Sequence, residues 1–333
     1  LSRGLGDVYK RQMGMLVDGV WGADFEGKQA PDGSFIRPES PYRNFITAPG
    51  RGDFPAEAGR YELIVAYACP WAHRALLYRA LLNLEDVIGV SIVHPISYPD
   101  GWNFMEYSDV SNNTGLKIDY LHQLYTHVDN KFTGKVTVPT LWDKKTKTIV
   151  NNESSEIIRM LDGPFCALTG QDENRMTKFY DNEKLQSMND LIYRGLNNGV
   201  YRVGFAKSQE AYFKAVDLLF KTLDELEKIL NENLFLLGDE ACEVDWRLLP
   251  TLVRFDPIYY YHFKCNKKKL RDYPNVHSYM HRLLNTPKVL STIKLDHVID
   301  HYYLSHLKIN PYAIIPVGVS YNLSLIHISE PTR

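Results

Sequence analysis

The chain has 333 residues, 44% of them hydrophobic and 23% charged, which is enough for about two globular domains with cores of their own. Its net charge of −2 excludes the strongly basic surface that nucleic acids and anionic membranes attract, so we expect neither as a partner. The four cysteines are too few and too scattered for a disulfide scaffold. No apolar run reaches the length of a membrane span, and we expect a reducing compartment, the cytoplasm.

The two ends of the chain differ in character from the rest. The segments 1–12 (LSRGLGDVYKRQ) and 323–333 (LSLIHISEPTR) resemble translated sequencing adapters. We therefore expect both to be non-native tails and Met13 to be the natural start, with the fold between them.

A β-α-β unit is the first predicted element. Residues 61–67 (YELIVAY) are strand formers, residues 71–84 place apolar side chains at helical spacing, and residues 86–93 (DVIGVSIV) form a second strand-type run. Two strands joined through a helix in this way pair in parallel.

An insertion with one helix, 94–135, is predicted next. Residues 136–161 (VTVPTLWDKKTKTIVNNESSEIIRML) then indicate an antiparallel hairpin and a helix that starts near Asn152. The order β-α-β-insertion-β-β-α is that of a thioredoxin-like domain, which we place at 13–165, with the insertion inside it.

The second half of the chain is predicted to be helical. In 208–231 the apolar residues form one stripe, and the segments LLPTLVRF and VHSYMHRLL continue this pattern. The turn residues of 163–174 make this stretch the best linker candidate. The predicted fold class is therefore α/β plus all-α, with an all-helical domain over 175–318.

Cys69 stands between the first strand and its helix. Pro70 suits the first helical position, which makes Cys69 the N-cap. There the free N–H groups and the helix dipole favour the thiolate, so we expect a lowered pKa and a reactive nucleophile. The alternative is a buried cysteine that only caps the helix.

The residue three positions after this thiol is Ala72, where a dithiol oxidoreductase has its second cysteine. A mixed disulfide at Cys69 must therefore be resolved by an external thiol, and glutathione is the natural one in a reducing compartment.

Two further segments fit a glutathione site. A cis Val138-Pro139 bond would turn the main chain of Val138 toward a ligand, although a trans proline at an edge strand is the alternative. The run NNESSE at 151–156 opens a helix whose N–H groups suit a carboxylate, with Ser154 as a donor and Glu153 as an acceptor. By itself this run fits a solvated helix N-terminus equally well.

Taken in order, several segments resemble the Xi-class glutathione transferases, the glutathionyl-hydroquinone reductases, over about residues 13–318. They are CPWAHR (69–74), GW (101–102), VTVPTLWD (136–143), NNESSEIIRML (151–161), NNGVYRVGFA (197–206), RFDPIYYYHFKCN (254–266) and HYYLSH…INPYAIIP (301–316). The resemblance implies that the helical domain is the C-terminal domain of a glutathione transferase and that the protein is a homodimer.

The resemblance also implies an enzyme that removes glutathione from aromatic glutathionyl-hydroquinones. The Cys69 thiolate would take the glutathionyl group and release the hydroquinone, and a second glutathione would leave as glutathione disulfide. Glutathione is then a co-substrate, and no metal takes part. Tyr201 matches the tyrosine that protonates the departing aromatic carbon, and Tyr259 and Tyr302 match two further tyrosines near the thiol.

By the same resemblance, a set of residues from the thioredoxin-like domain holds glutathione. They are Trp102, Lys135, Val136, Thr137, Val138, Glu153 and Ser154. For Trp102, a plug between the two domains is the alternative.

Two other functions stay open. One is an Omega-like thiol transferase or dehydroascorbate reductase, and the other is a non-catalytic, transferase-like binding module. The presence of Cys69, Ser154 and Tyr201 argues against the second.

The remaining cysteines and a histidine pair are given structural readings. Cys242 stands where a Ser or Thr usually caps a helix together with Asp245, so we expect a weakened cap and a gain of about 1 kcal/mol from Cys242→Thr. Cys166 and Cys265 are read as small hydrophobic residues. His297 and His301 lack a third metal ligand at convincing spacing, so a packed or solvated pair is favoured.

Overall fold

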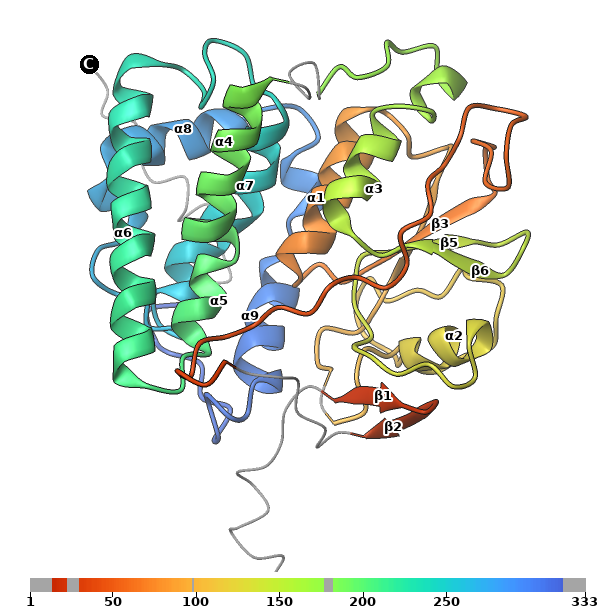
Figure 1. Ribbon diagram of the computed structural model, residues 1–333, viewed down its shortest axis with the longest axis horizontal. Helices are drawn as coiled ribbons and strands as arrows, with labels where there is room; N and C mark the ends of the chain where they lie inside the picture. Colours follow the sequence, from red (N-terminus) through yellow and green to blue (C-terminus); the bar gives the residue numbers. More distant parts are fainter. Residues whose placement is uncertain (1–13, 23–29, 98, 177–181, 320–333) are drawn as a thin grey trace, which may run out of the picture.

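The computed structural model describes residues 14–22, 30–97, 99–176 and 182–319 (Figure 1). The two expected non-native tails, and Met13 as the expected start, lie outside the described residues.

A four-stranded sheet forms the centre of the N-terminal half, in the order β4-β3-β5-β6. The first pair, β3 (Tyr61–Val65) and β4 (Gly89–Ile92), is parallel, as predicted. The second pair, β5 (Thr140–Asp143) and β6 (Thr148–Asn151), is the predicted antiparallel hairpin. Every residue of β3 and β5 is buried, including the polar residues Glu62, Thr140 and Asp143, as expected for the two central strands of a sheet covered on both faces.

Helices cover both faces of this sheet (Figure 1). The helices α1 (Pro70–Leu81) and α3 (Ser154–Leu161) pack against each other on the side of the helical domain. On the opposite side lies α2 (Leu121–Val128), the helix predicted inside the insertion, in contact with β6. The predicted thioredoxin-like order of elements is therefore confirmed.

A small N-terminal hairpin was not predicted. Its strands, β1 (Met15–Val17) and β2 (Val20–Gly22), are joined by Asp18 and Gly19, both at positive φ, as a two-residue hairpin turn requires. Leu16 bridges to Gly134, so this hairpin lies beside the segment that leads into β5.

Residues 30–60 cross from one half of the molecule to the other. In Figure 1 this segment runs from the foot of α5 to the sheet next to β6. At one end the Lys207 N–H donates to the Gly33 carbonyl (3.0 Å), and farther along the Asn44 N–H donates to the Val150 carbonyl (3.0 Å). We call residues 30–60 the strap.

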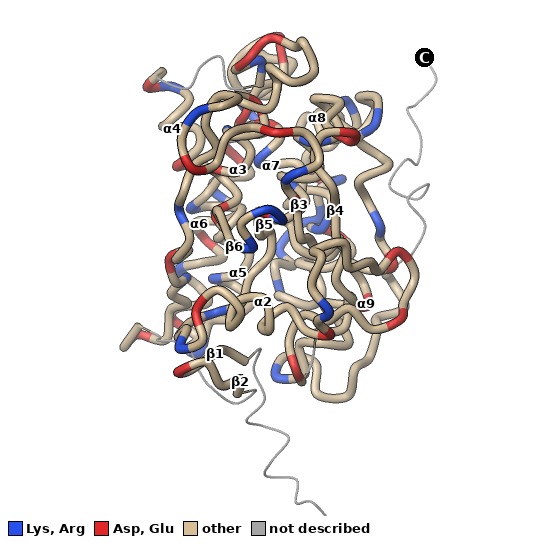
Figure 2. The backbone as a smooth tube through the Cα atoms, turned by 90° about the vertical axis from the view of Figure 1, so that its right-hand side faces the viewer, with Lys and Arg blue, Asp and Glu red and all other residues tan. Residues whose placement is uncertain are grey.

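The C-terminal half is helical, as predicted. Its helices are α4 (Glu183–Ile192), α5 (Gly199–Gly204), α6 (Gln209–Glu232), α7 (Glu243–Arg254), α8 (Pro274–Leu284) and α9 (Leu295–Ser305). The apolar stripe predicted over 208–231 is the buried face of α6. None of the described helices is long and apolar enough to cross a membrane. Figure 2 shows basic and acidic residues interspersed along the visible backbone, in line with the net charge of −2.

Two π-helical turns interrupt the regular helices of this half. The first, Tyr193–Asn197, leads into α5, and the second, Phe255–Tyr259, continues α7. Such turns are rare and concentrate at functional sites. Here they lead to Tyr201 and carry Tyr259, two of the predicted site residues.

The two halves are held together by buried polar contacts. Glu243 at the start of α7 is fully buried and accepts hydrogen bonds from Arg159 of α3 (2.9 and 3.0 Å) and from Arg247 (2.7 Å). Arg74 of α1 donates to the Asn197 side chain (2.8 Å). These contacts fix α1, which carries the predicted thiol at its start, against the helical domain.

Candidate active site at the domain junction

Cys69 is the N-cap of α1, and Pro70 occupies the first helical position, as predicted. The residue is half-buried, with an extended backbone (φ −80°, ψ 120°). Its Sγ donates a hydrogen bond to the Val138 carbonyl at 3.4 Å. The thiol thus lies between the start of α1 and the segment that leads into β5.

The predicted lowering of the thiol pKa is wrong in direction. Burial raises the pKa of Cys69, and this effect outweighs the backbone N–H groups of Ala72 and Trp71, which lower it. Two guanidinium groups, Arg254 and Arg37, also lower the pKa. The start of the helix acts on the thiol as expected, but the surrounding protein removes more solvent than the sequence indicated.

The segment 135–138 reaches the thiol through the main chain of Val138. Val138-Pro139 is a cis peptide bond, as predicted, and Val138 presents its carbonyl to Cys69. The neighbouring residue Thr137 is fixed by Tyr125, whose hydroxyl contacts both the carbonyl (3.1 Å) and the N–H (3.3 Å) of Thr137. Val136 is buried, and the Lys135 ammonium donates to the Gly14 carbonyl (3.4 Å) of the N-terminal segment.

The helix predicted near Asn152 begins at Ser154, with Glu153 as its N-cap. The Glu153 carboxylate accepts from the N–H (3.0 Å) and hydroxyl (2.9 Å) of Ser155, and from the Ser40 hydroxyl (3.1 Å) of the strap. Burial opposes ionisation, yet these hydrogen bonds hold the pKa of Glu153 below its usual value. The carboxylate therefore carries a full negative charge at neutral pH, as an acceptor for an amino group requires.

The three predicted tyrosines meet in one line of hydroxyl groups. The Tyr302 hydroxyl lies 2.8 Å from that of Tyr201 and 3.2 Å from that of Tyr259. Tyr259 and Tyr302 are buried, whereas Tyr201 is half-buried and therefore the most exposed of the three. Burial raises the pKa of all three phenols, so they stay protonated at neutral pH.

Trp102 lies at the junction of the two domains. Its ring stacks on His301 of α9, with centroids 4.8 Å apart and an angle of 21° between the rings. Gly101 before it has φ +81°, and a Cβ there would lie 2.8 Å from Trp21, so the turn needs glycine. This placement matches the plug between domains that the sequence left open as an alternative.

Sequence reasoning missed two arginines at this site. The Arg37 guanidinium of the strap lies over the rings of Trp71 (4.7 Å) and Tyr201 (4.8 Å), and its Nε donates to Asn198 (2.8 Å). Arg254 ends α7 and is 1% exposed. Arg37 stands in an irregular segment without any motif, and Arg254 stands inside a motif to which no role was given.

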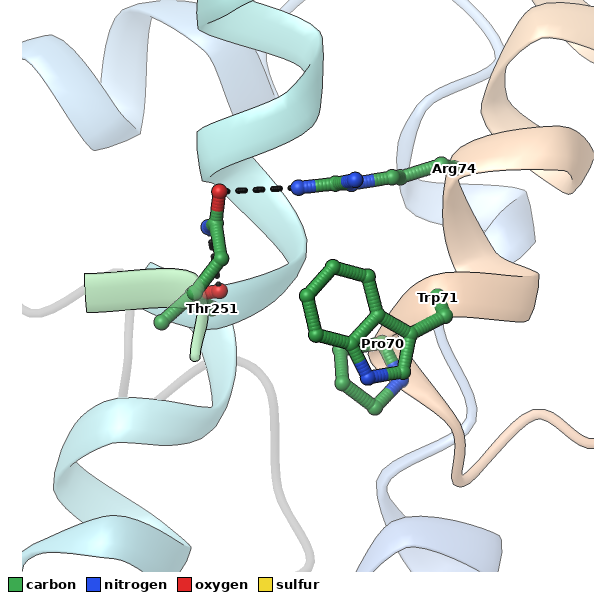
Figure 3. Close-up of a pocket in the computed structure, with 5 residues that line it drawn as sticks. Pro70, Trp71, Arg74 and Thr251 are labelled. Carbon is green, nitrogen blue, oxygen red and sulfur yellow. Dashed lines mark hydrogen bonds between the residues drawn. The ribbon is translucent and has the colours of Figure 1, made fainter. Parts of the chain in front are cut away.

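A small pocket at the junction is lined by Pro70, Trp71, Arg74, Asn197 and Thr251 (Figure 3). Arg74 of α1 reaches across it to the Asn197 side chain (2.8 Å), which donates in turn to the Thr251 hydroxyl (2.8 Å). Its lining is fixed by one hydrogen bond between the two domains and one within the helical domain.

The histidine pair of α9 faces main-chain carbonyls. His297 contacts the Ser108 carbonyl (2.9 Å) and His301 the Pro95 carbonyl (2.7 Å). Within the described parts of the chain, no group of three or more His, Cys, Asp and Glu is placed to hold a metal.

The other three cysteines are buried. Cys242 forms the predicted capping box with Asp245, whose carboxylate accepts from the Cys242 N–H (2.8 Å).

Two family models match this chain. The one described as glutathione S-transferase, N-terminal domain, matches residues 68–163, and the one described as glutathione S-transferase, C-terminal domain, matches residues 209–282. The first match contains Cys69, the cis bond and the start of α3.

Similar proteins cover nearly the full length of the chain. Glutathionyl-hydroquinone reductase YqjG of Escherichia coli strain K12 is 43% identical over 313 residues, which cover 92% of this chain and 95% of that protein. Glutathionyl-hydroquinone reductase PcpF of Sphingobium chlorophenolicum is 46% identical over 312 residues, covering 92% of this chain and 96% of that protein.

Solved structures agree with this fold. The glutathione-bound structure of YqjG from Escherichia coli K-12 superposes with a TM-score of 0.82 at 42% identity, covering 93% of this chain and 97% of that one. The Xi-class glutathione transferase of Natrialba magadii gives a TM-score of 0.84 at 39% identity and covers 96% of each chain.

Proposed function

This chain belongs to the Xi class of the glutathione transferase family, that of the glutathionyl-hydroquinone reductases, and we propose that it removes glutathione from glutathionyl-hydroquinones through Cys69. One observation carries the proposal: a half-buried thiol at the start of α1 lies within electrostatic reach of Tyr201, a protonated phenol. A nucleophile and a proton donor are the two groups that this reductive cleavage needs.

The first half-reaction transfers the glutathionyl group to the enzyme. The Cys69 thiolate attacks the sulfur of the glutathionyl-hydroquinone, forms an S–S bond and breaks the bond between sulfur and the aromatic carbon. Tyr201 donates its proton to that carbon, and the free hydroquinone leaves. The raised pKa of Tyr201 keeps the phenol protonated and ready for this step.

The second half-reaction restores the thiolate. Glutathione attacks the mixed disulfide and leaves as glutathione disulfide, and its thiol proton restores the Tyr201 phenol that the first step deprotonated. The sum is one glutathionyl-hydroquinone and one glutathione converted to hydroquinone and glutathione disulfide. The aromatic carbon is thus reduced by two electrons, and the two glutathione sulfurs are oxidised to a disulfide.

Glutathione is proposed to bind along the thioredoxin-like domain. In this proposal the main chain of Val136, Thr137 and Val138 pairs with the glutathione backbone, supported by the contact of the Val138 carbonyl with the thiol, and the charged Glu153 at the start of α3 suits the glutathione amino group. Ser154 in the first turn of α3 is buried and suits the neighbouring carboxylate.

Two further residues complete the proposed glutathione set. Lys135 contributes through its main chain, because its ammonium donates to Gly14. Trp102 is proposed to border this set from its plug position between the domains, where its ring stacks on His301.

The surroundings of Tyr201 favour a flat aromatic substrate. Its ring lies 6.2 Å from Tyr259 and 5.4 Å from Phe263, and the Arg37 guanidinium lies over its face. Aromatic rings and guanidinium planes stack on such substrates without specifying ring substituents.

An assay of two reactions tests the proposal against its rivals. We expect the rate of hydroquinone release from a glutathionyl-hydroquinone to exceed the rate of reduction of a glutathione mixed disulfide or of dehydroascorbate. We also expect Cys69→Ala to abolish the release. The reverse preference would favour an Omega-like thiol transferase. A Cys69→Ala variant indistinguishable from the wild type in every one of these assays would show that the thiol has no catalytic role and would favour a non-catalytic binding module.

The setting of this activity is part of the proposal. We place the enzyme in the cytoplasm as a homodimer, with a thioredoxin-like domain over 13–165 and a helical domain over 175–318. The four free cysteines suit a compartment rich in glutathione. Size-exclusion chromatography with light scattering tests the dimer.

A further inference from the structure

We propose that Arg254 is the buried counter-charge of the Cys69 thiolate, and that His73 is the positioning residue that holds this guanidinium in place. The inference rests on the proposed role of Cys69 as the nucleophile. It concerns how a thiol removed from solvent can still ionise.

The Arg254 side chain reaches from the end of α7 into the other domain. Its Nε donates to the Ala68 carbonyl (3.0 Å) and its Nη2 to the Tyr67 carbonyl (2.7 Å), the two residues before Cys69. Its Nη1 donates to Pro250 of its own helix (2.8 Å). The guanidinium is thereby fixed against the loop that carries the thiol.

The fourth contact of this guanidinium identifies the protonation of His73. Nη1 of Arg254 lies 3.1 Å from Nδ1 of His73. Because a guanidinium only donates, Nδ1 must accept, and the ring proton must stand on Nε2. Nε2 then donates to the Thr292 hydroxyl (2.8 Å), which donates to the Val289 carbonyl (2.7 Å).

His73 remains neutral in this chain of contacts. Burial and the charge of Arg254 both lower the pKa of His73 well below its usual value. The four hydrogen-bonded partners of Arg254 are therefore neutral: three carbonyls and one imidazole. Among the residues that the structure describes, no carboxylate forms an ion pair or hydrogen bond with this guanidinium.

A buried cation without an anion is costly, because carbonyl dipoles replace only part of its hydration. On the side of the tyrosines, the charge of Arg254 lowers the pKa of Tyr259, Tyr302 and His301. Burial keeps both phenols protonated, and it lowers the pKa of His301 to about 4, so all three are neutral at pH 7.

On the other side, the charged and titratable groups that act on Cys69 are Arg254, Arg37 and the phenol of Tyr201. Tyr201 is protonated, and Arg37 is a second cation, whose guanidinium lies over aromatic rings. Among the groups named here, only Cys69 can therefore supply an anion next to Arg254. The attraction of Arg254 reduces, without cancelling, the effect of the burial that disfavours ionisation at Cys69.

Alkylation of Cys69 by iodoacetamide across a pH series tests this role, because only the thiolate reacts. In Arg254→Gln we expect the midpoint of the profile to rise by about one pH unit or more, and the rate at pH 7 to fall about tenfold. Arg254→Lys retains the charge but not the planar fork, so we expect its midpoint between those of Arg254→Gln and the wild type. The modified cysteine is identified by mass spectrometry of its peptide.

Arg74→Gln is the matched control. Arg74 is also a buried guanidinium at the domain junction, but its hydrogen bonds go to the Arg247 carbonyl and the Asn197 side chain, whereas those of Arg254 reach the loop that carries the thiol. We expect it to lower stability while leaving the alkylation midpoint at the wild-type value.

An unchanged midpoint in folded Arg254→Gln would overturn the proposal, and so would a rise of equal size in the Arg74 control. If Arg254→Gln does not fold, His73→Leu decides, because it keeps the guanidinium but removes its imidazole acceptor. We expect its midpoint to rise by about half a unit, and no rise would overturn the coupling of the two residues. Alkylation needs neither glutathione nor hydroquinone, so this result is independent of the proposed reaction.

Discussion

Replacing Tyr201 by phenylalanine separates the two half-reactions of the proposed enzyme. The substitution removes one hydroxyl, which forms a hydrogen bond with the Tyr302 hydroxyl at 2.8 Å. Tyr302 keeps its contact with Tyr259 at 3.2 Å, so the buried hydroxyl of Tyr302 is not stranded. The loss of stability should therefore be that of one hydrogen bond, about 1 kcal/mol.

The expected loss of activity is much larger than this loss of stability. A positioned general acid contributes about 100-fold to 10,000-fold, and we expect release of hydroquinone to slow at least about 100-fold. Attack of glutathione on the mixed disulfide places no proton on carbon, so its rate should stay within about twofold of the wild type. The phenyl ring should keep its contact with Phe263, whose centroid lies 5.4 Å away.

Rapid mixing measures the two steps separately. A single turnover with a glutathionyl-hydroquinone reports the first step, and glutathione added to the preformed Cys69–glutathione disulfide reports the second. Tyr212→Phe is the control, because this hydroxyl donates to the exposed Lys264 carbonyl (2.9 Å) of the same helical domain. An unchanged first step in Tyr201→Phe, or an equal slowing of both steps, would refute the role of Tyr201 as proton donor.

The remaining predictions concern the stability of α7. Burial raises the pKa of Glu243, but the hydrogen bonds from Arg159 and Arg247 outweigh this effect and lower the pKa below 4.5. Glu243→Gln should cost about 3 kcal/mol in urea unfolding, since it leaves two arginines without their buried carboxylate, and no loss would contradict the interdomain contact. The stability that Glu243 contributes is present above about pH 4.5 and is lost as the pH falls through the lowered pKa, so the wild type should lose more stability below pH 4.5 than Glu243→Gln. Cys242→Thr should raise the free energy of unfolding by about 1 kcal/mol, because a hydroxyl accepts the N–H of Asp245 better than sulfur does; a lower urea midpoint would contradict this, and Cys242→Ser controls for the added methyl group.

Much of the fold follows from local patterns in the chain. The stripe of 208–231 became α6, and the apolar runs around Pro70 became the parallel pair β3 and β4, because each pattern matched the period of its element. The hairpin β1–β2 escaped prediction because its strands have three residues each and depend on the bridge from Leu16 to Gly134. The π-helical turn at Phe255–Tyr259 also escaped, because it leaves the helical pattern of apolar residues nearly unchanged.

The site was only partly predictable, for a physical reason. The N-cap position of Cys69 depends on its neighbour Pro70, and such local geometry can be read from the sequence. The thiol pKa depends instead on how deeply the folded protein buries the thiol and on the charge of Arg254, which comes from the helical domain. Burial of this kind is set by tertiary packing, and the sequence pattern of neither segment specifies it.

The most direct test of the central claim is the mass of the protein after one turnover without free glutathione. With one equivalent of a glutathionyl-hydroquinone, we predict that one glutathionyl group becomes attached at Cys69 and that one equivalent of hydroquinone is released. Added glutathione should then restore the original mass and release glutathione disulfide. Hydroquinone released without any adduct at Cys69 would contradict the account.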